Sequence, residues 1–184
     1  MFFNKDKNKN NFFSNKICIF VATIISKKKT MDEKILQKTI LLAKQNIEKG
    51  GGPFAAIIVK NGEIIAESAN SVTLDNDPTA HAEVNCIRLA CKQLGTFSLQ
   101  GCEIYSSCEP CPMCLSAIYW AHIDKIYYAA TKNDAAFGGF DDDFIYKELS
   151  KQPFERQIPA KNFLQETGRK VFDIWNSTQN KIKY

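Results

Sequence analysis

Four residues in two short motifs have the types and the spacing of a catalytic zinc site. His81 and Glu83 form a His-x-Glu motif, and Cys111 and Cys114 lie in a Pro-Cys-x-x-Cys motif that begins 27 residues after Glu83. One imidazole and two thiolates give Zn²⁺ three protein ligands, which is the ligand number of a catalytic site that keeps a fourth position for water. Glu83 is not needed as a ligand, so we expect it to transfer protons.

Cys108 leaves a second kind of zinc site open. Because it precedes Cys111 by three residues, it could join the other ligands in a closed Cys₃His site with a structural role. The chain would then be a zinc-stabilised binding module. A structural site has no use for the free carboxylate of Glu83, and Cys108-Glu109-Pro110 has the pattern of a strand end that directs Cys108 elsewhere. We therefore favour the open, catalytic site.

The spacing also indicates which elements position these residues. His81 and Glu83 are two residues apart, so they share no helix face and meet one pocket only where the N-terminal tip of a helix enters it. Cys111 and Cys114 are three residues apart and share a face, and Pro110 suits the entry of that helix. Two helix N-termini would then direct partial positive charge at the thiolates.

Residues 31–184 have the pattern of one α/β domain. The spacing of Leu36, Ile40, Ala43 and Ile47 predicts a helix, and Asn61-Gly62 predicts a hairpin turn. The expected strands are 54–60, 63–70, 102–106 and 125–130, and the further expected helices are 80–94, 111–121, 144–149 and 169–176. A hairpin followed by alternating strands and helices predicts a three-layer α/β/α sandwich with a mixed central sheet. Both metal-binding helices should start on the same side of that sheet.

Charge divides the chain near residue 30. The formal net charge is +4, but residues 1–30 hold seven lysines and one aspartate, so residues 31–184 carry 17 basic and 19 acidic groups, a net charge of −2. A faintly acidic domain argues against nucleic-acid binding. We expect residues 1–30 to be a Lys- and Asn-rich extension that is disordered or not expressed, with Met31 as the working start. A targeting role is the remaining alternative.

Membrane insertion and disulfide bonding are not expected. The apolar run 17–25 is too short to span a bilayer. The seven cysteines include the thiolate ligands and form no even disulfide framework, which indicates a reducing compartment and a cytoplasmic location.

Longer stretches resemble the cytidine deaminase superfamily. They are Asn70, residues 76–83 (Asn-Asp-Pro-Thr-Ala-His-Ala-Glu) and residues 107–114 (Ser-Cys-Glu-Pro-Cys-Pro-Met-Cys). Guanine deaminases and tRNA adenosine deaminases share the first run, so it does not distinguish them. The stretches 115–121, 128–130, 139–142 and 144–148 and the terminal Tyr184 resemble the bacterial guanine deaminases.

This resemblance implies hydrolysis of guanine to xanthine and ammonia. It implies one Zn²⁺ per chain, held by His81, Cys111 and Cys114, with Glu83 as the proton carrier. It assigns substrate contacts to Phe54, Asn70, Ala82, Asp142 and Tyr184. The alternatives are a tRNA adenosine deaminase or a deaminase of another small nucleobase.

Asp142 and Tyr184 each have a second interpretation. Guanine presents N–H donors at N1 and the exocyclic amine, and the Asp142 carboxylate only accepts, but Asp142 could instead be a solvated loop residue or a helix N-cap. The resemblance implies a homodimer. Exchange of the C-terminal segment, with Tyr184 closing the partner's site, is one way to form it. Tyr184 could instead be a frayed terminus.

Overall fold

A four-stranded mixed sheet forms the centre of the computed structural model, which describes residues 30–183. The strands are β1 (Ala55–Lys60), β2 (Glu63–Ala69), β3 (Cys102–Cys108) and β4 (Lys125–Ala130), in the order β2-β1-β3-β4. β1 pairs antiparallel with β2 and β3, whereas β3 and β4 are parallel. The mixed sheet predicted from the sequence is confirmed.

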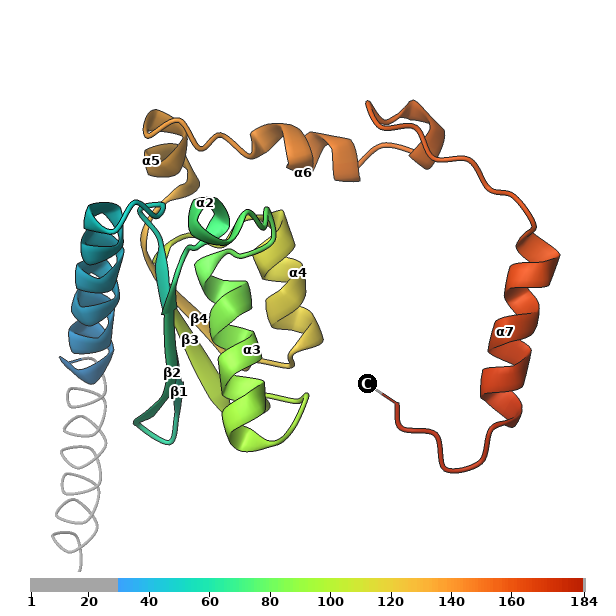
Figure 1. Cartoon of the computed structure of the whole chain (residues 1–184), viewed down its shortest axis with the longest axis horizontal. Helices are drawn as coiled ribbons and strands as arrows, with labels where there is room; N and C mark the ends of the chain where they lie inside the picture. The colour runs from blue at the N-terminus through green and yellow to red at the C-terminus, as the bar shows by residue number, and fades with distance from the viewer. Residues whose placement is uncertain (1–29, 184) are drawn as a thin grey trace, which may run out of the picture.

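Helices cover both faces of this sheet (Figure 1). A first helix, residues 30–48, lies on one face, and α3 (Ala82–Leu94) and α4 (Pro112–Trp120) lie on the other. The remaining helices are α2 (Val72–Asp75), α5 (Lys132–Phe137), α6 (Asp143–Leu149), the 3₁₀ turn η1 (Pro153–Glu155) and α7 (Gln165–Ser177). The predicted three-layer α/β/α architecture is therefore confirmed.

β1 holds the layers together because its apolar sequence is buried on both faces. Ala56 and Ile58 belong to the core under α3 and α4. Ile57 and Val59 belong to a second core, which they form with Tyr105 and the first helix. Successive side chains of a strand point to opposite faces, so a continuous apolar run serves two layers. The turn after β1 places Asn61 and Gly62 at φ values of 53° and 83°, as the predicted two-residue hairpin requires.

The first helix is present as predicted, but its buried face differs from the apolar spacing. Thr39 and Asn46 are buried, whereas Ile40 and Ile47 are exposed. Burial of polar side chains is tolerated here because each is hydrogen-bonded. The Thr39 hydroxyl donates to the Ile35 carbonyl at 2.8 Å, and the Asn46 amide bonds to two carbonyls outside the helix.

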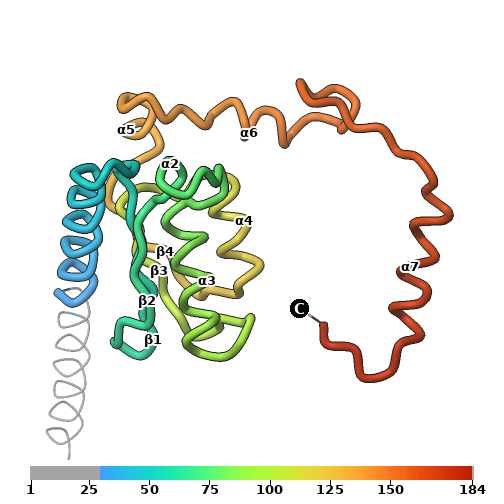
Figure 2. The backbone as a smooth tube through the Cα atoms, in the orientation of Figure 1, coloured from blue at the N-terminus to red at the C-terminus, as the bar shows by residue number. Residues whose placement is uncertain are grey.

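The chain beyond α6 leaves the layered body. Figure 2 follows residues 150–183, here called the C-terminal arm, through η1 and α7, and α7 lies well apart from the sheet. Residues 1–29 and Tyr184, on which the predicted extension and the predicted lid depend, lie outside the described residues. None of the described helices combines the length and apolar character that a membrane crossing requires.

Candidate active site and metal centre

Each chemical motif starts a helix at the same end of the molecule. His81 is the N-cap of α3 and Cys111 is the N-cap of α4, both with extended backbone. The proline in the first turn of α4 is Pro112, not Pro110 as the sequence suggested. Neither N-cap side chain is used for capping within the described chain. Both side chains are therefore available to a ligand in front of the helix tips.

The three proposed zinc ligands have the spacing that one tetrahedral zinc ion requires. His81 Nδ1 lies 3.5 Å from Cys111 Sγ and 3.5 Å from Cys114 Sγ, and all three donor atoms lie within 4.8 Å of one another. Bonds of about 2.3 Å to sulfur and about 2.0 Å to nitrogen at tetrahedral angles place the two atoms about 3.5 Å apart. The residues present therefore fit Zn²⁺.

The two cysteines differ in how readily they lose a proton. The pKa of Cys111 is lowered to about 4, first by its hydrogen bond with Cys114 and then by His81. The same hydrogen bond and burial raise the pKa of Cys114. The lowered pKa of Cys111 favours its thiolate, which is the form that binds a metal.

Glu83 lies beside the three donors in the first turn of α3 and is 5% exposed. The Ser106 hydroxyl donates to its Oε1 at 2.9 Å, and Cys114 Sγ lies 3.3 Å from its Oε2. Burial raises the pKa of the Glu83 carboxyl. Ser106 was not predicted from the sequence, because a serine inside a strand has no spacing that marks it.

Cys108 does not take part in the metal centre. Among residues 30–183, the group of three or more possible ligands is His81, Cys111 and Cys114. Cys108 Sγ lies 3.5 Å from the Thr131 carbonyl, and burial raises its pKa to about 11, so it remains a thiol. The closed Cys₃His alternative is therefore wrong, because the end of β3 directs Cys108 toward Thr131.

A cavity of about 610 Å³ opens at the metal centre. Its wall brings together six residues predicted from the sequence: Phe54, Asn70, His81, Glu83, Cys111 and Asp142. Ala82 contributes no side chain to this wall, because its methyl group is buried in the core. As the first residue of α3, Ala82 has a backbone N–H without an intrahelical acceptor.

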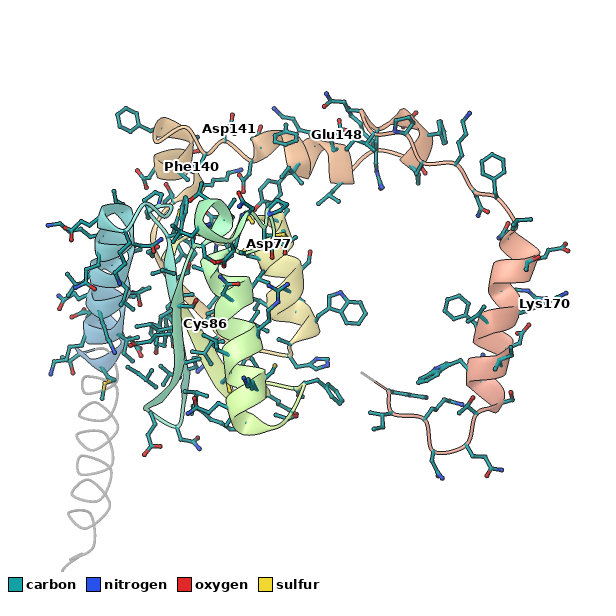
Figure 3. The ribbon with its side chains drawn as sticks, viewed as in Figure 1. Asp77, Cys86, Phe140, Asp141, Glu148 and Lys170 are labelled. Atoms are coloured by element: carbon teal, nitrogen blue, oxygen red, sulfur yellow. The ribbon has the colours of Figure 1, made fainter. Side chains whose placement is uncertain are left out.

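Two aromatic rings form the apolar side of the cavity. The rings of Phe54 and Phe140 pack edge to face, with centroids 5.0 Å apart and an interplanar angle of 85°. Figure 3 labels Phe140 and Asp141 in the segment that passes over the end of the sheet. Phe140 was not assigned a role from the sequence, although it lies in a stretch that carried the family resemblance.

Asp142 occupies the N-cap position of α6, but its carboxylate forms no capping hydrogen bond within the described residues. The neighbouring Asp141 instead accepts from the backbone N–H of Asp143 at 3.0 Å. Burial raises the pKa of Asp142, and its side chain lines the cavity. The N-cap interpretation is correct for the position of Asp142 and leaves its carboxylate available to a ligand.

Asn70 lies directly after β2 and is also buried at the cavity wall. Its Oδ1 accepts from the backbone N–H of Val72 at 3.3 Å. Its own backbone N–H donates to the Phe54 carbonyl at 2.9 Å. The amide NH₂ group of Asn70 is the part that can donate to a ligand.

Comparison with known families and structures agrees with this site. The family model of the cytidine and deoxycytidylate deaminase zinc-binding region matches residues 29–130. The chain is 52% identical to a guanine deaminase of Bacillus subtilis over 83% of its own length and 98% of that protein. It is 46% identical to a tRNA-specific adenosine deaminase of Aquifex aeolicus, over 82% and 97% of the two lengths. The X-ray structure of guanine deaminase from Bacillus subtilis superposes with a TM-score of 0.81 and covers 83% of this chain and 98% of that one.

Proposed function

Because this chain belongs to the family of the cytidine and deoxycytidylate deaminase zinc-binding region, we propose that it hydrolyses guanine to xanthine and ammonia. The observation that carries this proposal is the 52% identity to a guanine deaminase along 98% of that protein. The site supports it independently, because a cavity with room for a purine base joins a zinc-fitting donor set, a buried carboxylate and an aromatic wall.

The metal of this family is zinc, and His81, Cys111 and Cys114 are the residues that would hold it here. Bound zinc supplies a Lewis acid that lowers the pKa of water toward about 7. The reaction forms a bond from the water oxygen to C2 of guanine and breaks the bond from C2 to the exocyclic amine. Glu83 takes a proton from the water and delivers it to the ring nitrogen next to C2. It then carries a second proton from the new C2 hydroxyl to the departing amine, so that C2 keeps a carbonyl oxygen and the amine leaves as ammonia.

The other cavity residues bind and orient the base. Phe54 stacks on the ring, and the Asn70 amide and the Ala82 N–H donate to its acceptors. Asp142 accepts from the N–H donors at N1 and the exocyclic amine. Adenine presents a lone pair at N1, which this carboxylate repels, so Asp142 selects guanine over adenine.

Deamination of an adenosine in tRNA is the competing function, because the similarity to the Aquifex aeolicus enzyme is also nearly full-length. An RNA substrate needs basic surface along its phosphates. The net charge of −2 on residues 31–184 opposes this. Small-molecule chemistry therefore fits this domain better than RNA binding, and a role in purine breakdown follows.

The C-terminal arm supports a homodimer formed by exchange of the arm. Val171, Phe172, Ile174 and Trp175 of α7 are all exposed, Phe172 by 67%. An isolated chain rarely leaves so many large apolar side chains in water, and exchange of a terminal element is a low-cost route to a symmetric dimer. The dimer would bury this face of α7 against a second copy.

The position of the arm end favours a lid that acts on the partner. Lys183 lies near Tyr119 and His122, at the end of α4 opposite Cys111. Lys183, the last described residue, does not line the cavity of its own chain, which favours exchange as the way to bring the end of the arm to a partner's cavity. A closing aromatic ring would exclude water from the reacting base.

The six cysteines among the described residues are free. Free thiols, three of them buried outside the metal centre, suit a reducing compartment. A cytoplasmic location is proposed on this basis.

The proposed reaction is tested by incubating the zinc-loaded protein with guanine and measuring xanthine and ammonia. The wild-type protein should release equal amounts of xanthine and ammonia. The variant Glu83→Gln should keep the zinc content of the wild type but turn over guanine roughly 10²–10⁴-fold more slowly. Loss of zinc from this variant would show that Glu83 is a metal ligand. Absence of xanthine with the wild-type protein would overturn the proposed function.

A further inference from the structure

We infer that Asn46 is a positioning residue for the base-binding wall of the cavity, where its side-chain amide sets the separation of Phe54 and Asn70. This inference rests on the proposed use of that wall to bind a purine. Asn46 lies in the last turn of the first helix, and it does not line the cavity itself. It therefore acts through Phe54 and Asn70 and not by touching the base.

Asn46 joins three segments with one nitrogen atom. It is 6% exposed, and its Nδ2 donates to the Gly52 carbonyl at 2.8 Å and to the Asn70 carbonyl at 2.7 Å. Gly52 lies two residues before Phe54, and the Gly52 carbonyl also accepts from the Phe54 N–H at 2.8 Å. The two protons of one amide thus fix the backbone on both sides of the base-binding wall.

The pairing of β1 with β2 explains why this support is needed. The strand register ends at Ala55 opposite Ala69, and one further bond follows, from Asn70 N–H to the Phe54 carbonyl at 2.9 Å. Beyond that bond the segments that flank β1 and β2 diverge into loops. Asn46 provides the next connection between them, so it takes the place of the strand pairing that has ended.

The glycine run at residues 50–52 shows how closely the loop packs on this amide. A Cβ atom on Gly51 would lie 2.3 Å from Asn46 Nδ2, and one on Gly52 would lie 3.0 Å from Asn70 Oδ1. The backbone therefore packs directly against the two asparagine side chains, with no room for a side chain between them. The Asn46 amide therefore depends on the glycines at 51 and 52, which let the backbone pack directly against it.

The chemistry of the contact specifies an asparagine. Both partners are carbonyl oxygens, which require donors. An aspartate of the same size would place carboxylate oxygens against these carbonyls, and glutamine is longer by one methylene than the space at Gly51 allows. Loss of the amide would leave the buried Asn70 carbonyl without this donor.

The inference is tested by steady-state kinetics of Asn46→Ala, with Thr39→Ala as the matched control. Thr39 is a fully buried polar residue of the same helix, and its hydroxyl bonds only within that helix among the described contacts. We expect Asn46→Ala to raise KM for guanine roughly tenfold with kcat changed by less than about threefold, since base binding is loosened. Thr39→Ala should lower Tm and leave KM unchanged.

A double-mutant cycle with Asn70→Ala separates positioning from general destabilisation. Because Asn46 acts in part through the side chain of Asn70, Asn46→Ala should lower kcat/KM less in the Asn70→Ala background than in the wild type, and the remaining loss reports on Phe54. The inference would be overturned if the loss of kcat/KM in the double variant equalled the product of the two single losses. Equal KM changes in Asn46→Ala and Thr39→Ala would also overturn it.

Failure of the proposed function would appear separately, as a wild-type protein that releases no ammonia from guanine. The same four variants are then compared on the base that the wild type deaminates. An unchanged KM of Asn46→Ala on that base overturns the positioning role.

Discussion

The Ser106 hydroxyl donates a 2.9 Å hydrogen bond to Glu83 Oε1. Ser106 is buried on β3, and Glu83 lies in the first turn of α3, so the contact joins the sheet to the helix that carries the proton-transfer group. Cys114 Sγ lies 3.3 Å from the other carboxylate oxygen. The bond from Ser106 holds one carboxylate oxygen beside the metal centre, so Ser106 determines the orientation of the carboxylate.

Removal of this hydroxyl should slow turnover without loss of the metal. In Ser106→Ala we expect kcat to fall roughly tenfold with little change in KM, because outer partners of a metal site typically contribute 10–100-fold. Zinc content measured by atomic absorption should equal that of the wild type. Unchanged kcat would show that Glu83 is oriented by other contacts.

Ser107→Ala is the matched control for that variant. The neighbouring Ser107 hydroxyl accepts from the Ala55 N–H at 3.0 Å and has no contact with Glu83 among the described bonds. Its loss leaves a buried N–H unpaired, which costs about 1–3 kcal/mol of unfolding free energy. Thermal denaturation should show this loss, while kcat stays within about twofold of the wild type.

Zinc binding should distinguish Cys108 from Cys111. Cys108→Ser is expected to retain one zinc per chain and its activity, because Cys108 contacts the Thr131 carbonyl. Cys111→Ser should lose both, since it removes a thiolate ligand. Metal analysis after dialysis against a weak chelator provides the comparison. Zinc loss in Cys108→Ser would restore the structural-site interpretation.

Asp142→Asn should impair guanine turnover more than any neighbouring acidic substitution. An amide offers one acceptor where the carboxylate offers two, so kcat/KM for guanine is expected to fall by roughly 10–100-fold. Asp143→Asn is the control, because Asp143 forms half-exposed ion pairs with Lys132 and Lys147, and such pairs contribute little. Similar losses in both variants would assign Asp142 a structural role.

Deletion of residues 181–184 should reduce turnover of guanine by about tenfold or more while zinc and Tm are retained, because the lid that excludes water is lost. The exchange itself is tested by co-expressing this truncated chain with Glu83→Gln. In an exchanged heterodimer the intact arm of the Glu83→Gln chain completes the site of the truncated chain. About one quarter of wild-type activity per chain is then expected from random pairing. No recovery would mean that the arm acts within its own chain or not at all.

The sequence was sufficient where local chemistry determines structure. The Asn61-Gly62 turn, the apolar run of β1 and the two helix starts at His81 and Cys111 follow from local propensity and spacing, and the structure confirms them. The predicted end of α3 at residue 94 is also correct, and Gly95 follows it in the left-handed conformation that glycine favours after a helix.

Contacts between residues far apart in the sequence could not be predicted in this way. Ser106 and Asn46 acquire their roles from partners 23 and 24 residues away, which no local pattern encodes. The face of the first helix was misjudged at Ile40 and Ile47 because burial of Thr39 and Asn46 depends on hydrogen bonds that form only in the fold.

The ratio of kcat/KM for guanine to that for the wobble adenosine of a tRNA anticodon stem-loop tests the central claim most directly. Both substrates are compared with the same zinc-loaded protein, by release of ammonia. Guanine is expected to be preferred by at least about 10³-fold, because Asp142 accepts from its N–H donors and opposes the N1 lone pair of adenine. Faster deamination of the RNA would contradict the claim and assign the cavity to a tRNA adenosine deaminase.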